Sequence, residues 1–318
     1  MMHLRVISPA GRTAEVLDVL KADPAVANLV VHRGAAVDPE GDVVIADVAR
    51  ESANEVVDSL KRLGLQASGS IALDPVSVAL SDAGVRAEQA AAGDGADAVV
   101  WDEIEQRTGE ESHLSANFLL FLSIATIIAG IGVLLDQPIL IVGAMVVGPE
   151  FGPLAAFSVG VVRRRPRIIG RSVLAIVVGF TVAIAIATLS TLALDAFGLV
   201  DRDMLLAPRP LTDFIWRPDA LSWVIGFLAG IAGILSLTSA KSGALIGVLI
   251  SVTTVPAAGN IAVAIAYGAA DEAWGSALQL VINLGAIVTA GILTLAVQRL
   301  IRRRSRGAGT HPALNQRR

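Results

Sequence analysis

Cysteine is absent from the 318 residues, and histidine and charged residues are scarce. The absence of cysteine excludes disulfides, thiolate nucleophiles and cysteine-bound metals. Four histidines lie scattered without the paired spacing of a zinc enzyme, so we expect no metal site, and no motif predicts a cofactor. Charged residues make up 17% of the chain, against roughly 25% in soluble domains. A soluble enzyme is therefore not the first expectation.

Apolar residues are abundant and gather in the second part of the chain. They make up 54% of all residues, and the mean hydropathy is +0.67. Residues 1–115 hold 9 basic and 20 acidic side chains, whereas residues 116–318 hold 16 basic and 9 acidic ones. Because a soluble globule cannot bury so much apolar surface, we predict an acidic soluble domain followed by a polytopic α-helical membrane protein.

Residues 1–73 are predicted to form a cytoplasmic ferredoxin-like α+β domain. Strand-like and helix-like patterns follow one another in the order βαββαβ, over residues 2–7, 12–22, 27–32, 43–49, 52–63 and 68–73. Such a domain can serve docking or dimerisation, or bind a small regulatory ligand between two copies. Its acidic charge disfavours nucleic acid as a partner.

Residues 74–113 are predicted to be an acidic linker with one short amphipathic helix, over residues 98–106. The apolar side chains of this helix are Val99, Val100, Trp101 and Ile104. Two alternatives are open for them: packing on the first domain, or contact with the membrane surface.

Residues 114–300 contain six apolar stretches, each longer than the roughly 18–20 residues that cross a bilayer. They cover residues 114–135, 139–162, 172–194, 220–240, 242–270 and 273–298, and the one formal charge among them is Glu150. Basic residues cluster at 163–167, at Lys241 and in the tail, residues 301–318. Because basic loops stay in the cytoplasm, we expect a multi-pass protein of the cell (inner) membrane with both termini cytoplasmic.

The second and fifth spans share a pattern that predicts broken helices. Each has an apolar half, an interruption with Gly and Pro, and a second apolar half; the interruptions are Gly148–Pro153 and Val255–Asn260. Each is the middle span of a group of three, so the second group runs opposite to the first. This pattern is typical of a 3+3 inverted repeat that binds its substrate at the breaks. Alternatively, Pro and Gly are simply tolerated in membrane helices, whose neighbours accommodate kinks.

Three segments of the membrane region carry a resemblance to a known family. They are residues 123–132 followed by Asp136, residues 141–145 leading into Gly148-Pro149 and Gly152-Pro153, and the region around Val255-Pro256. In these segments the chain resembles the uncharacterised hydrophobic-domain membrane family (domain of unknown function 389). The resemblance covers roughly residues 99–300 and implies a membrane protein of unresolved activity. Family members usually have an apolar residue where this chain has Glu150, and often two adjacent prolines where it has Pro256 alone.

Glu150 is the residue with which we most expect function to be associated. It lies near the middle of its span, where an ionisable side chain is costly and a functional hypothesis by default. The predicted site for a substrate or ion combines residues of both breaks: Glu150, Gly148, Pro149, Gly152, Pro153, Thr253, Thr254, Pro256 and Asn260. Alternatively, Glu150 is a structural residue at a helix or subunit contact, and the threonines bond to their own helix.

These features lead to two hypotheses of function. The first is a transporter or channel-like permease for a small polar solute or ion, coupled to protons through Glu150 and gated by the first domain. So small a site would need a homo-oligomer to complete it. The alternative is a membrane-anchored sensor or scaffold whose spans serve oligomerisation. We expect no enzyme, because apart from Glu150 the spans hold no catalytic constellation and no histidine.

Overall fold

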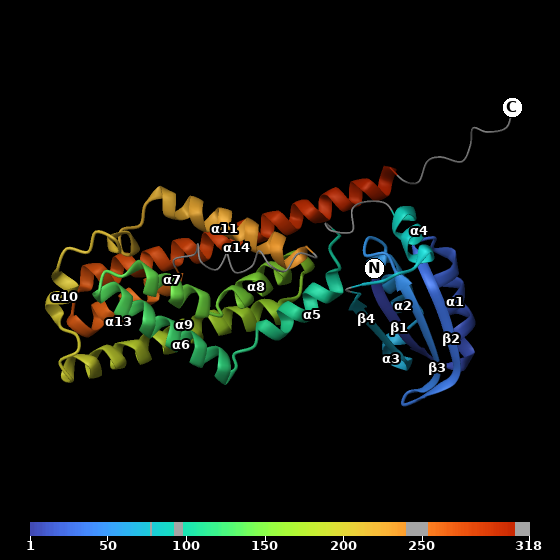
Figure 1. Ribbon diagram of the computed structural model, residues 1–318, viewed down its shortest axis with the longest axis horizontal. Coiled ribbons are helices and arrows are strands. Elements are labelled where there is room, and N and C mark those ends of the chain that lie inside the picture. The colour runs from blue at the N-terminus through green and yellow to red at the C-terminus, as the bar shows by residue number, and fades with distance from the viewer. Residues whose placement is uncertain (77, 92–97, 240–253, 309–318) are drawn as a thin grey trace. The chain divides into compact units, whose positions relative to one another are not determined.

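The computed structural model of the chain describes residues 1–76, 78–91, 98–239 and 254–308 (Figure 1). The chain divides into two compact units. The first is built mainly from residues 1–104, and the second from residues 105–237 and the described part of residues 241–299. The division falls inside one helix, α5 (Trp101–Glu111).

The first unit contains a four-stranded antiparallel sheet with the strand order β2-β3-β1-β4 (Figure 1). Its elements are β1 (Met2–Ser8), η1 (Ala10–Arg12), α1 (Thr13–Ala22), β2 (Val26–Val37), β3 (Glu40–Val48), α2 (Ala53–Arg62), α3 (Leu65–Ser68) and β4 (Ser70–Pro75). The strands and main helices follow in the predicted order. Strand β2 is longer than expected, because its pairing with β3 continues to Val37 and Glu40 beside the turn.

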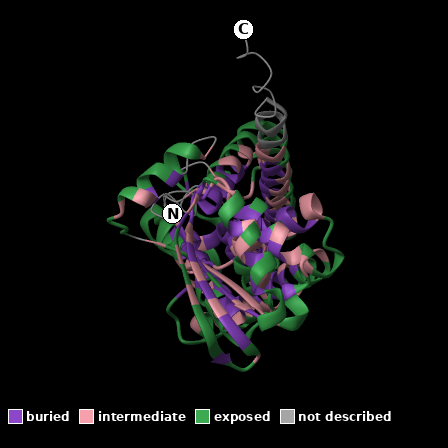
Figure 2. Cartoon of the chain, turned by 90° about the vertical axis from the view of Figure 1, so that its right-hand side faces the viewer, coloured by how far each residue is buried: buried purple, intermediate pink, exposed green. Residues whose placement is uncertain are grey.

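Alternation along the strands directs one set of side chains into a core. In β1, Met2, Leu4 and Val6 are buried, whereas Arg5 between them is exposed. The buried set packs with apolar residues of β3, α1 and α2, and buried positions colour the strands purple in Figure 2. Burial of these faces accounts for the pattern that predicted the strands.

The predicted linker contains a helix that the sequence analysis missed, α4 (Asp82–Ala90). The Ser81 hydroxyl caps it by accepting a hydrogen bond from the Gly84 N–H, and the helix packs on β2 and β3. The following helix, α5, begins at Trp101 and reaches Glu111, later and longer than predicted. Val100 lies in the core of the sheet. Packing on the first domain is therefore the correct alternative for Val100.

The second unit is built from apolar helices. They are α6 (Ala116–Leu134), α7 (Pro138–Val147), α8 (Phe151–Arg163), α9 (Pro166–Ala196), α11 (Ala220–Thr238), α13 (Thr254–Tyr267) and α14 (Ala270–Ala308), with short α10 (Arg202–Leu206) and η2 (Asp213–Ile215). Among the described residues, four of these helices are long and apolar enough to cross a membrane. The bent pair α7 and α8 counts as a fifth candidate. The first part of the predicted fifth span, up to residue 253, lies outside the described residues.

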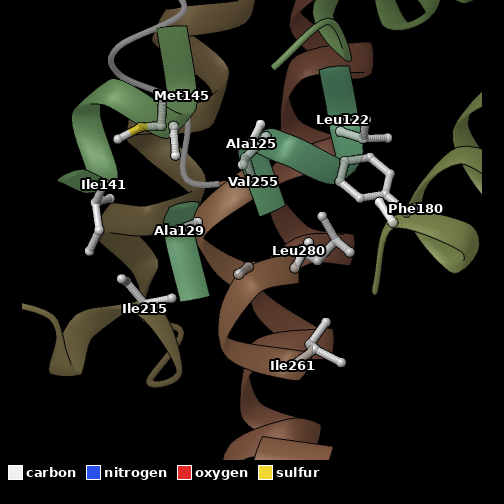
Figure 3. Close-up of a cluster of buried hydrophobic side chains, with 14 of the residues drawn as sticks. Leu122, Ala125, Ala129, Ile141, Met145, Phe180, Ile215, Val255, Ile261 and Leu280 are labelled. Atoms are coloured by element: carbon white, nitrogen blue, oxygen red, sulfur yellow. The ribbon is translucent and has the colours of Figure 1, made fainter. Parts of the chain in front are cut away.

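Helix α13 lies at the centre of this unit, against α6, α7 and α9. All residues from Thr254 to Ala264 are buried. Small side chains permit this close packing: a Cβ on Gly259 would lie 2.7 Å from the Gly130 nitrogen of α6. Figure 3 shows the surrounding apolar cluster, in which Val255 of α13 lies near Ala125 of α6.

The core position of Val100 predicts how much of the chain the first unit needs in order to fold. A fragment of residues 1–104 is expected to unfold cooperatively in urea. A fragment of residues 1–91 keeps every strand but loses Val100, whose burial contributes about 2 kcal/mol. Circular dichroism should therefore place its unfolding midpoint at a lower urea concentration. Equal midpoints, or a gradual transition for residues 1–104, would contradict this assignment.

Candidate functional site

The second span is broken where the sequence predicted a break. Helix α7 ends at Val147, α8 begins at Phe151, and their axes differ by 51°. Pro149 has no N–H to continue the hydrogen bonding of α7, and a residue before proline avoids helical backbone. Gly148 accordingly has an extended backbone, with ψ of 128°. The proline thus ends the first half-helix inside the apolar stretch.

The Glu150 side chain turns back across this break. Glu150 occupies the position that precedes the first turn of α8, but its carboxylate makes no capping hydrogen bond there. Instead Oε1 accepts a 2.7 Å hydrogen bond from the Thr254 hydroxyl of α13. The residue is only 4% exposed, and Oε2 has no hydrogen-bond partner among the described residues. One oxygen is therefore held by a second helix while the other is available.

Gly148 leaves the space that the carboxyl group of Glu150 occupies. A Cβ at this position would collide with Glu150 Oε2 and would lie 2.7 Å from Cγ2 of Val255. The absence of a side chain therefore lets the broken span and the start of α13 meet. We call Gly148, Glu150, Thr254 and Val255 the Glu150 site.

The fifth-span residues are arranged differently from the prediction. Residues Val255–Asn260 are not an interruption: they belong to the continuous helix α13, and the prediction of a break there is wrong. Pro256 fits because it lies in the first turn, where an N–H needs no helical partner. Thr254 joins Glu150 as described, whereas Thr253 lies outside the described residues.

Asn260 belongs to a second polar cluster, further along α13. It lies six residues beyond Thr254, roughly 9 Å along the helix axis. Its side-chain nitrogen donates a 2.8 Å hydrogen bond to the Ser276 hydroxyl of α14, and its oxygen accepts from Arg209. Arg209 also pairs with Glu272 at the start of α14. The structure therefore divides the predicted site into two clusters.

The sequence analysis missed Arg209 and Glu272, which it left among connecting residues. One signal could have drawn attention to Arg209: it lies in a connection predicted to be outside the cytoplasm, where basic residues are disfavoured. The structure buries Arg209, whose side chain is 4% exposed.

Gly152 and Pro153 lie in the first turn of α8. Pro153 is buried, and Gly152 lies at the edge of a pocket of about 370 Å³. The pocket also touches Gly148 and Pro149, and its polar wall comes from α5, α6 and the residues between them: Glu110, Glu111, His113, Ser115 and Asn117. A Cβ on Gly152 would lie 3.1 Å from Glu111 Oε2. The pocket thus reaches the backbone of the break.

Glu111 is the pocket residue whose ionisation is most perturbed. Its side chain is 41% exposed, but the loss of part of its hydration against the pocket wall raises the pKa of its carboxyl group, and the Arg107 guanidinium 3.6 Å away opposes this rise. A proton is therefore held more readily here than on a free glutamate.

Comparison with known protein families finds one family that matches this chain. Residues 145–289 match the family described as a domain of unknown function (DUF389). This stretch runs from α7 into α14 and includes Glu150, and it confirms the resemblance seen in the sequence. The uncharacterized protein MJ0678 of Methanocaldococcus jannaschii is 25% identical over 195 residues, 61% of this chain. The chain matches 58% of the length of that relative. No solved structure matches this chain.

Chemically, the Glu150 site can bind a proton or a small cation. A carboxyl group in an apolar interior is stabilised by hydrogen bonds or by a bound positive charge, because water does not solvate it there. The Thr254 hydroxyl satisfies one oxygen, and the other oxygen can take a proton or face a cation. The site therefore places an ionisable group, with one oxygen unpaired among the described residues, inside an apolar bundle.

The crowding at Gly148 yields a direct prediction. In Gly148→Ala the new methyl group displaces the Glu150 carboxylate or Val255, and such overpacking costs about 1–3 kcal/mol. We expect a lower unfolding temperature of the purified protein in detergent.

Gly143 is the matched control, because it lies in the same half-helix and a Cβ there meets no atom within 4 Å. Gly143→Ala should leave the unfolding temperature unchanged or slightly raised. Equal losses in both variants would mean that the contact at Gly148 is not specific.

Proposed function

We propose that the protein is a membrane transporter or channel-like permease for a small polar solute or ion, with Glu150 as the residue that exchanges a proton. The observation that carries the proposal is the bond between Glu150 Oε1 and the Thr254 hydroxyl, at a helix break within an apolar bundle. A charge-bearing side chain in that place is a functional hypothesis by default.

The geometry of the site suits an exchange of partners. Glu150 is held by one hydrogen bond from another helix, and its second oxygen is unpaired among the described residues. Protonation would remove its charge and change its capacity to accept hydrogen bonds. A small shift of α7 and α8 relative to α13 would then accompany each proton, since the carboxyl group lies between them.

The wider architecture that we propose is six spans in a 3+3 inverted repeat. The meeting of the second-span break with the start of α13 supports it, because such repeats place their middle spans together. For the first unit, the strand order β2-β3-β1-β4 supports a ferredoxin-like domain, which would sense a ligand and gate the spans.

The distribution of basic residues and the small size of the site are our grounds for proposing a localisation and an assembly. The basic residues after α8 and in the tail favour a cell (inner) membrane protein with both termini in the cytoplasm. We propose a homo-oligomer that uses no cofactor and catalyses no covalent reaction.

A membrane-anchored sensor or scaffold is the second candidate function. The observation that favours it is the dense packing of α13, where Val255 and Glu150 together fill the space at Gly148. In that case the hydrogen bond to Thr254 fastens helices together and carries no proton.

Glu150→Gln separates the two functions, because it keeps the shape and hydrogen bonding of the side chain but cannot titrate. In proteoliposomes tested with a panel of ions and small metabolites, pH-dependent uptake should fall roughly tenfold or more. Folding and oligomer size should be unchanged. Glu40→Gln, an exposed position on the first unit, is the matched control and should transport normally.

Normal pH-dependent uptake by Glu150→Gln would refute a role in proton exchange. Loss of assembly, measured by light scattering of the same variant, would favour the scaffold instead.

A further inference from the structure

The connection between α9 and α11 is not a plain surface loop. Residues 197–219, which we call the cap segment, contain α10 and η2 and send five side chains into the interior. These are Val200, Leu205, Arg209, Thr212 and Ile215. A connecting loop normally runs over the surface, because its backbone polar groups need water. This one is held by the helices beneath it.

Apolar contacts fix both parts of the cap segment. Leu205 and Val200 pack with Leu134 at the end of α6 and with Val263 of α13. Ile215 is fully buried in the main apolar cluster, where Figure 3 shows it near Ala129 of α6. The cap segment therefore covers the end of the bundle at which α13 ends and α14 begins.

Polar contacts fix the middle of the cap segment. Asp136, just after α6, accepts hydrogen bonds from the Leu211 N–H at 3.2 Å and the Thr212 hydroxyl at 2.9 Å. On the other side Trp216 lies so close to Gly275 of α14 that a Cβ there would be 3.2 Å from the Trp216 carbonyl carbon.

Arg209 makes a charged contact of the cap segment, and it is buried. Its guanidinium pairs with the Glu272 carboxylate and donates to the Asn260 side-chain oxygen at 3.5 Å. Within the described part of the chain, Arg209 Nε and Glu272 Oε2 have no hydrogen-bond partner. A buried pair with such gaps stabilises a structure less than apolar packing of the same volume would. The Arg209–Glu272 pair is thus suited to be a contact that forms and breaks.

We propose that the cap segment is a gate over this end of the bundle and that the Arg209–Glu272 pair is its latch. The inference rests on the proposed transport function, because it gives the Glu150 site an exit at the far end of α13. From Thr254 to Tyr267 the helix rises by roughly 20 Å, so a solute leaving Glu150 in that direction meets the cap segment. Opening the latch moves Arg209 away from Asn260 and uncovers the Asn260–Ser276 hydrogen bond below it.

The lack of cysteine makes a thiol-accessibility test direct. Ser276→Cys places one reactive atom beneath the cap segment, and Ala207→Cys places one on its exposed surface. In detergent, a charged methanethiosulfonate reagent should label Ala207→Cys quickly and Ser276→Cys slowly. Adding Arg209→Ala should raise the labelling rate of Ser276→Cys about tenfold or more, because the cap segment then opens more often.

Arg217→Ala is the matched control. Arg217 lies in the same segment, but its side chain is largely exposed, pairs with Asp213 and lies over the Trp216 ring, 4.5 Å from its centroid. The loss of Arg217 keeps the Arg209–Glu272 pair and should leave the rate unchanged. Glu272→Gln provides a second test of the latch, with little change of shape, if Arg209→Ala does not fold. Ala175→Cys, buried near the other end of α9, should stay protected in every variant.

Three results would overturn the proposal. They are fast labelling of Ser276→Cys with the latch intact, equal rates for the Arg209→Ala and Arg217→Ala variants, and simultaneous exposure of Ala175→Cys, which would indicate general loosening. The assay needs no solute, so its failure is distinct from a failure of the transport hypothesis.

Discussion

The hydrogen bond from Thr254 to Glu150 joins the break of the second span to the central helix α13. On one side, Pro149 ends α7 and leaves a bend of 51° before α8. On the other, α13 begins at Thr254. In an apolar interior neither an unpaired hydroxyl nor an unpaired carboxylate oxygen is tolerated without cost, and the Thr254 hydroxyl satisfies one of the two carboxylate oxygens at 2.7 Å. The absence of a side chain at Gly148 makes the approach possible, so the proline, the glycine and the carboxylate form one arrangement.

Small residues also allow the helices to pack closely elsewhere in the bundle. Because Gly259 meets Gly130 at close range, α13 lies deep among its neighbours, and polar groups on it are cut off from solvent. Each must then find a partner on another helix. Thr254 finds Glu150, and Asn260 finds Ser276 and the cap segment. Burial of one central helix thus generates both polar clusters, one at its start and one further along.

The sequence predicts what periodicity and composition determine. The strand alternation around Met2, Leu4 and Val6, four of the charge-free spans and the break at Pro149 all follow from local patterns, and the described part of the structure has each of them. It does not predict contacts made across the chain. Arg209 and Glu272 lie 63 residues apart, and nothing local distinguishes this pair from exposed charges. Helix α4 was missed because alanine and glycine suggested a linker.

The most direct test of this account is a double-mutant cycle on the central hydrogen bond. Glu150→Met and Thr254→Val each leave the other polar group buried without its partner, which costs about 1–3 kcal/mol, whereas removing both groups leaves neither unpaired. Thermal unfolding of the purified protein should therefore show a double variant more stable than the sum of the single losses, by about 0.5–3 kcal/mol. Losses that add to within about 0.5 kcal/mol would show that the two side chains are not coupled, and would contradict the account.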